Sequence, residues 1–156
     1  MLRRFISGLV IVTVSVSTAF AEWRVTSEKD RLTGATVKTA WLRATNNEQT
    51  QLAIRCLIDP LVGGLYVEIL TPIQFTRGRL AFRYRLDDQP VETRYIPPRS
   101  DGWGVQVLNR ADEALGAKRM RIELLPGNKA GLFYEFDLTG IDKVMREMQC
   151  QETRTY

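Results

Sequence analysis

Histidine is absent from this chain of 156 residues, and cysteine occurs only twice. Without histidine the chain has no Ser-His or Cys-His pair for nucleophilic catalysis, and it lacks the commonest protein ligand of zinc. The two cysteines, Cys56 and Cys150, form no Cys-x-x-Cys motif, which argues against a redox site. An enzyme built on this chain would have to use carboxylates, lysine or tyrosine as acid and base.

Long apolar runs are missing after residue 21, and the run before it is short. Arg3 and Arg4 precede about a dozen apolar residues, fewer than a bilayer-spanning helix needs. Ala19-Phe20-Ala21 then has the small-x-small pattern of a signal peptidase site. We therefore expect residues 1–21 to be a signal peptide cleaved near Ala21, rather than an uncleaved anchor. The mature chain should have no transmembrane span and should be periplasmic or secreted.

Excess charge is also small. The formal net charge of +4 includes Arg3 and Arg4, so residues 22–156 carry about +2, spread along the sequence. A nucleic-acid-binding protein concentrates its basic residues on one element, so we expect no nucleic-acid partner. Composition predicts a single β-rich domain over residues 22–150, followed by a polar tail over residues 151–156.

Short segments of alternating polarity, separated by turn residues, predict a mainly β fold. The clearest is 79–86, in which Leu80, Phe82 and Tyr84 share one face. Polar residues 45–50 and 97–102 predict loops. The pattern favours an antiparallel β-sandwich or barrel-like sheet over a βαβ fold. The first predicted strand begins at Trp23 and stops at residues 28–30. The other predicted strands are 35–44, 52–56, 65–70, 91–96, 119–124 and 132–138.

One helix is expected at the C-terminal end, where the apolar period changes to that of a helix. Thr139 is the expected N-cap, with Asp142 completing a variant of the capping box. Two cysteines in an oxidising compartment usually pair, so a Cys56–Cys150 disulfide should tie the helix to a strand. An intermolecular bond or free thiols are the alternatives. The predicted apolar stripe of the helix is Ile141, Val144, Met145 and Met148.

Candidate catalytic and ligand-binding motifs are weak. Glu135 and Asp137 lie two apart on one strand face, so they could act as a carboxylate pair on a glycosidic bond or form a solvent-facing row. Asp87-Asp88 lacks the ligand spacing of a calcium loop, and Gly63-Gly64 is not followed by the Lys-Ser/Thr of a phosphate-binding loop. We predict no catalytic residue, no metal site and no cofactor.

A basic stripe is the strongest candidate for partner binding. Arg79, Arg83 and Arg85 share one face of the 79–86 segment and could meet an acidic partner or an anionic polymer. The alternative is a solubilising strand face that pairs with Glu92 across a hairpin. Trp103, beside a Pro/Gly-rich loop, is the second candidate for partner binding.

Several short motifs follow one another along the chain. They are Glu22-Trp23-Arg24-Val25, Asp30-Arg31-Leu32-Thr33-Gly34, Leu52-Ala53-Ile54-Arg55-Cys56, Phe82-Arg83-Tyr84-Arg85-Leu86-Asp87, Ser100-Asp101, Phe136-Asp137-Leu138-Thr139-Gly140-Ile141 and Cys150. In the order of these motifs the chain is similar to the small exported proteins associated with type VI secretion, the VasI or TagO-like family, although Leu86 stands where that family usually has an aromatic residue. The resemblance implies an accessory role in the cell envelope, an envelope or secretion-system protein as partner, and no catalytic residue.

These observations predict a non-enzymatic periplasmic accessory or binding protein. One alternative is an exported inhibitor of a lysozyme-like hydrolase, in which the 97–103 loop enters the cleft of the target. A second alternative is a glycan hydrolase that uses Glu135 and Asp137.

Overall fold

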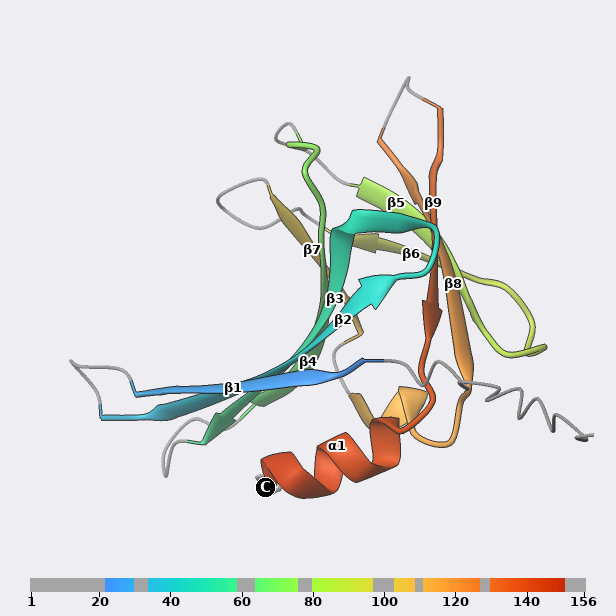
Figure 1. Ribbon diagram of the computed structural model, residues 1–156. Coiled ribbons are helices and arrows are strands. Elements are labelled where there is room, and N and C mark those ends of the chain that lie inside the picture. The colour runs from blue at the N-terminus through green and yellow to red at the C-terminus, as the bar shows by residue number, and fades with distance from the viewer. Residues whose placement is uncertain are drawn as a thin grey trace, which may run out of the picture.

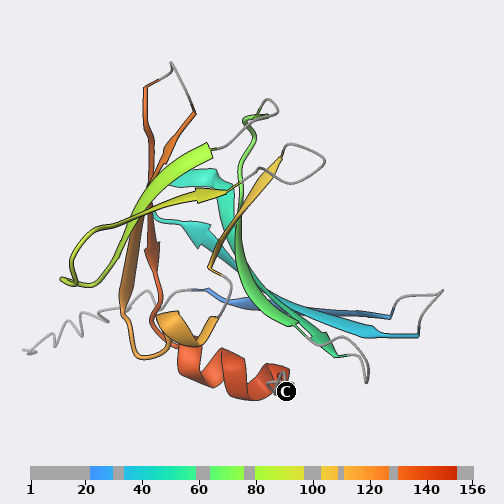
Figure 2. The same ribbon diagram turned by 180° about the vertical axis from the view of Figure 1, so that it is seen from behind.

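Two antiparallel sheets and a C-terminal helix make up the computed structural model (Figure 1, and from behind in Figure 2). It describes residues 22–29, 34–58, 64–75, 80–96, 103–108, 111–126 and 130–150. The predicted sandwich-like β fold with one C-terminal helix is therefore confirmed. The predicted signal peptide, the polar tail and Arg79 lie outside the described residues.

The five-stranded sheet has the order β1-β2-β3-β4-β7, and the four-stranded sheet has the order β6-β5-β8-β9. The first sheet consists of β1 (Arg24–Lys29), β2 (Thr36–Ala44), β3 (Asn47–Ile58), β4 (Gly64–Leu70) and β7 (Gly104–Leu108). The second consists of β5 (Leu80–Leu86), β6 (Glu92–Ile96), β8 (Arg119–Leu125) and β9 (Leu132–Asp137).

Two parts of the sheets differ from the sequence expectation. Strand β7 lies in a segment for which no strand was predicted. The predicted loop over 45–50 is wrong, because β3 begins at Asn47 and the turn itself is only Thr45 and Asn46. A register shift at Arg43/Ala44 lets this polar hairpin end continue the pairing of β2 with β3.

The core lies between the inner faces of the two sheets. Alternation places Leu80, Phe82 and Tyr84 of β5 inward, as predicted, and Phe82 is fully buried. From the five-stranded sheet, the buried side chains include Leu52, Ile54, Val67, Ile69 and Val105, and β8 and β9 add Met120, Ile122, Leu124, Tyr134 and Phe136.

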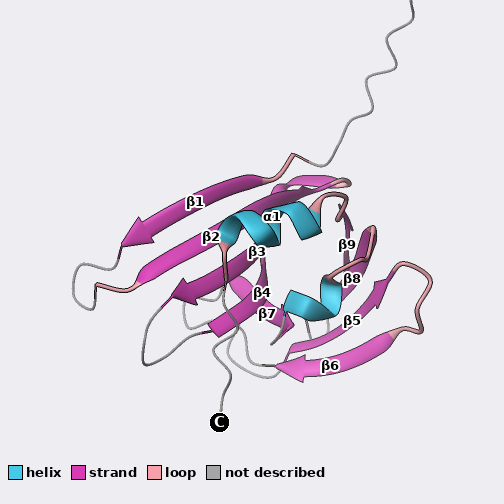
Figure 3. Ribbon diagram, turned by 90° about the horizontal axis from the view of Figure 1, so that it is seen from below, coloured by secondary structure: helices cyan, strands magenta, loops and turns pink. Residues whose placement is uncertain are grey.

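Helix α1 (Ile141–Met148) and the short 3-10 helix η1 (Ala111–Ala114) lie at one end of the molecule, as Figure 3 shows from below. Ile141, Val144 and Met148 are buried, so the predicted apolar stripe faces the core, and Met145 is partly buried beside it. Within the described residues, no helix combines the length and the apolar character needed to cross a membrane.

The predicted capping box is wrong. The N-cap residue is Gly140, whose φ of 87° lies in the left-handed region that favours glycine. Thr139 instead donates its hydroxyl to Asp137, and Asp142 accepts the backbone N–H of Gly116. The capping side chains are therefore used to hold neighbouring loops rather than the first turn of the helix.

The predicted disulfide is present. Cys56 on β3 and Cys150 after α1 are bonded, with 5.9 Å between their Cα atoms. Beside the bond, the Lys38 ammonium donates to the carbonyl oxygen of Met148 at 2.8 Å, which satisfies one carbonyl in the last turn of the helix. A disulfide and a hydrogen bond thus hold α1 against the five-stranded sheet.

Side chains on the outer face of the five-stranded sheet form a row of contacts from β1 to β4. The Trp41 indole N–H donates to Thr26 Oγ1 at 3.1 Å, and the Arg55 guanidinium lies 5.7 Å from the centre of the Trp41 ring. Arg55 Nε in turn lies 2.8 Å from a carboxylate oxygen of Glu68, which is almost fully buried. The row connects four neighbouring strands side by side.

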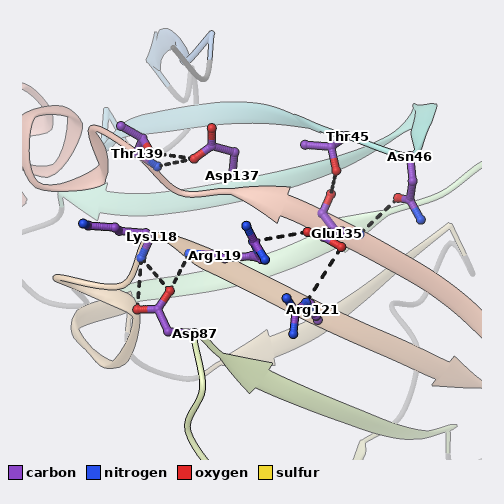
Figure 4. A network of polar contacts seen from close by, with 9 residues as sticks. All are labelled: Thr45, Asn46, Asp87, Lys118, Arg119, Arg121, Glu135, Asp137 and Thr139. Carbon is purple, nitrogen blue, oxygen red and sulfur yellow. Dashed lines mark hydrogen bonds and ion pairs between the residues drawn. The ribbon is translucent and has the colours of Figure 1, made fainter. Parts of the chain in front are cut away.

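The turn between β2 and β3 covers the edge of β9 (Figure 4). The Thr45 backbone N–H donates to the Glu135 carbonyl at 2.7 Å. The Asn46 side chain accepts the Glu135 N–H at 3.1 Å and donates to the Phe133 carbonyl at 3.0 Å. The amide of Asn46 therefore pairs with β9 as a neighbouring strand would, and it joins the two sheets.

A second turn is held by Asp87, which has a positive φ of 47°. Its carboxylate accepts the backbone N–H groups of Lys118 and Arg119 at 3.0 and 2.9 Å (Figure 4). The turn that ends β5 thereby positions the start of β8.

Replacing both cysteines with alanine should lower the free energy of unfolding by about 4–5 kcal/mol, because the bond closes a loop of 94 residues in the unfolded chain. Denaturant unfolding of both proteins, with and without reductant, measures this. Reductant should destabilise the wild type only. Equal stability of the oxidised wild type and the double variant would contradict the assignment.

Asn46→Ala should destabilise the protein by about 1–2 kcal/mol, because two hydrogen bonds to the β9 backbone are lost. Asn46→Asp should also destabilise the protein, because it keeps the acceptor for the Glu135 N–H but turns a carboxylate oxygen toward the Phe133 carbonyl oxygen. Asn47→Ala serves as the control, since Asn47 bonds only locally, to the Gln49 N–H. An Asn46→Ala variant as stable as the control would show that this contact does not hold the sheets together.

Candidate partner-binding face

The outer face of the four-stranded sheet carries most of its charge in cross-strand rows. Arg83 lies opposite Glu123 and forms an ion pair with it. Arg121 lies opposite Glu135, whose carboxylate forms ion pairs with Arg119 and Arg121, at 3.2 and 3.8 Å from their Nε atoms (Figure 4). Both acids in these rows, Glu123 on β8 and Glu135 on β9, therefore already form an ion pair with at least one arginine.

Arg85 differs from the other arginines on this face. Within the part of the chain that the structure describes, it forms no ion pair. Its cross-strand neighbour on β8 is Arg121, another cation. Like charges directly opposite each other on a sheet face destabilise it, so a bound anion between these two arginines would be favourable.

A shallow hollow of about 270 Å³ lies at this position. Arg83, Arg85 and Arg121 line it together with one acid, Glu123, so its charged lining is mostly basic. Val91 and Phe133 also line it and are 58% and 51% exposed. This combination suits a carboxylate that is carried beside an apolar group.

The candidate carboxylate pair on β9 is held in other contacts. Glu135 is shared by two arginines, and Asp137 accepts the backbone N–H and the hydroxyl of Thr139 at 3.0 and 2.6 Å. Among the described residues, no group of three or more acidic or cysteine side chains could hold a metal ion. The contacts of Glu135 and Asp137 favour a structural row on the sheet surface.

The sequence-predicted partner-binding residues fall on different surfaces. Arg83 and Arg85 lie together on the four-stranded sheet, whereas Trp103 immediately precedes β7 of the other sheet. Trp103 is 46% exposed, and its carbonyl accepts the Thr71 N–H. Arg79 and residues 97–102, which include most of the proposed inhibitory loop, lie outside the described residues.

Sequence reasoning missed Arg121, Phe133 and Val91 as members of this face. Alternation already placed Arg121 on the polar side of its strand, but only the pairing register shows that it lies opposite Arg85. Phe133 could have indicated this face from the sequence, because it is a large apolar residue that lies between inward-facing Leu132 and Tyr134 on β9 and therefore points outward.

The expected pairing of Glu92 with the basic stripe is wrong, because Glu92 lies opposite Tyr84 on the other face of the sheet. The Tyr84 hydroxyl donates to Glu92 at 2.8 Å, and Arg94 bridges Glu92 and Glu113 at 3.0 and 3.1 Å. Burial and the bond to Glu92 raise the pKa of Tyr84. The hydrogen bonds from Tyr84 and Arg94 lower the pKa of Glu92.

This cluster predicts a modest dependence of stability on acid pH. Since the pKa of Glu92 is lower in the folded state, its contacts stabilise the protein at neutral pH and are lost as the pH falls through that lowered pKa. Glu92→Gln should therefore weaken the loss of stability between about pH 5 and pH 3. Urea unfolding across this range measures the effect.

Glu48→Gln is the matched control, because Glu48 is an exposed acid on the other sheet that forms no ion pair within the described residues. It should leave the pH dependence unchanged. Identical pH profiles for Glu92→Gln and the wild type would contradict the role given to the cluster.

Comparisons with known proteins add no family to these observations. No family model matches the chain, and no curated protein or solved structure matches it. The resemblance to the type VI secretion-associated family therefore rests on the order of its sequence motifs alone.

Proposed function

We propose that the protein is an exported, non-enzymatic binding protein of the cell envelope that holds an acidic protein partner on the outer face of its four-stranded sheet. The observation that carries this proposal is Arg85. It has no ion pair among the described residues, and it lies opposite Arg121 beside exposed Phe133.

Charge and apolar surface act together in this proposal. An acidic side chain placed between Arg85 and Arg121 would relieve their repulsion and could accept charge-assisted hydrogen bonds from both guanidinium groups. Phe133 and Val91 would supply the apolar contact that an interface needs at its centre. A partner with carboxylates beside apolar residues therefore fits this face better than a purely anionic polymer.

The contacts of Glu135 and Asp137 also favour a binding role over glycan hydrolysis. Glu135 and Asp137, the carboxylates considered for glycan hydrolysis, are bound to arginines and to Thr139. These contacts hold both carboxylates as parts of the sheet surface.

The proposed compartment is the periplasm or the extracellular space, reached after cleavage near Ala21. The Cys56–Cys150 disulfide supports this, because such bonds persist mainly in oxidising compartments. The resemblance to the VasI or TagO-like family makes an envelope or secretion-system component the first partner to test.

Site-specific photo-crosslinking tests the proposal. A photoreactive amino acid at Phe133 should capture a defined envelope protein in intact cells. Arg85→Glu should weaken this capture on the order of tenfold or more, because it replaces an attraction with a repulsion. Immunoblotting or mass spectrometry of the crosslinked species measures the yield.

Arg43→Glu is the control, because Arg43 is an exposed arginine on the five-stranded sheet. It makes the same change in net charge and should leave the crosslink intact. Equal capture by Arg85→Glu and the wild type, or capture that Arg43→Glu abolishes equally, would refute this binding face.

A further inference from the structure

Strand β1 forms an open edge of the five-stranded sheet. It pairs with β2 on one side, and no other strand of the described residues pairs with its second side. Five of its six residues are exposed, and only Thr26 is partly buried. The backbone N–H and C=O groups along this side are thus available to another strand.

Two charged side chains on the outer face of β1 have no ion-pair partner within the described residues, and the third charged residue of the strand, Lys29, lies on the inner face. Arg24, Thr26 and Glu28 alternate onto the outer face, where Arg24 lies opposite Trp41. Within the described residues neither Arg24 nor Glu28 forms an ion pair. All three line a groove of about 840 Å³ that Trp41 and Arg43 also line.

The order of these charges is self-complementary. When two copies of one strand pair antiparallel about a twofold axis normal to the sheet, the residue at the axis lies opposite the same residue of the second copy. Side chains on the outer face of one copy then lie on the outer face of the other. Two such registers keep five residues of each β1 strand paired, one centred on Thr26 and one on Ser27. Only the first places opposite charges together, with Arg24 of each copy opposite Glu28 of the other.

We propose that β1 pairs antiparallel with β1 of a second copy of this chain, centred on Thr26, so that the two five-stranded sheets become one continuous sheet. Two Arg24–Glu28 pairs then form on the outer face, and Val25, which is 40% exposed, is covered on the inner face opposite Ser27 of the second copy. The two grooves meet at the twofold axis. This surface is separate from the face that holds Arg85.

Charge reversal distinguishes this pairing from a merely structural role of the same residues. Arg24→Glu places two acids opposite each other at both pairs, and Glu28→Arg places two arginines there. The dissociation constant of the dimer should therefore be higher for each single variant than for the wild type, on the order of tenfold or more. Sedimentation equilibrium of the disulfide-bonded protein over a concentration series measures the constants, and circular dichroism checks that each variant is folded.

Complementation supplies the decisive measurement. An equal mixture of the two single variants should form a heterodimer, because every facing pair is then an acid with an arginine. The double variant R24E/E28R should restore the homodimer. Arg85→Glu, which changes the other face, should dimerise like the wild type.

A wild type that stays monomeric across the series overturns the proposal. So do single variants that dimerise as strongly as the wild type, and so does a mixture of them that stays monomeric. Loss of the crosslink from Phe133 in Arg85→Glu, with dimerisation intact, would show that the two surfaces act independently.

Discussion

The hydrogen bonding of the Thr45–Asn46 turn to β9 is the contact on which much of this molecule depends. It closes an edge of the four-stranded sheet with side-chain and backbone groups from the other sheet. It also holds the backbone of Glu135, whose carboxylate positions Arg119 and Arg121. Arg121 in turn lies opposite Arg85, which forms no ion pair within the described residues. A turn in one sheet is thus connected through Glu135 and Arg121 to the binding face of the other.

Local pattern was enough to predict much of the fold. The alternation of Leu80, Phe82 and Tyr84 identified an inward strand face, and helical spacing identified the buried stripe of α1. The disulfide followed from there being only two cysteines in a chain that the sequence predicts to be exported. These features depend on residues that are near in sequence or on a choice with few alternatives.

The parts that could not be predicted depend on distant pairing. Strand β7 joins the five-stranded sheet beside β4 after the chain has passed through two strands of the other sheet. Glu92 was expected beside the arginines, but register places it opposite Tyr84 on the other face. The same holds for the binding face, where alternation finds Arg83 and Arg85 but only register shows that Arg85 meets another arginine. The residues that lie opposite one another on paired strands therefore could not be deduced from composition or alternation alone.

The row of contacts from Thr26 through Trp41 and Arg55 to Glu68 has a consequence for recognition. A strand at the edge of a sheet ordinarily loses conformational entropy when another strand binds to it, and that loss opposes association. Here Thr26 is held to β2, and β2 is held through a cation–π contact to Arg55, whose ion pair with the almost fully buried Glu68 joins β3 and β4. The edge is thereby ordered before any partner arrives, so less of the binding free energy is spent on ordering it.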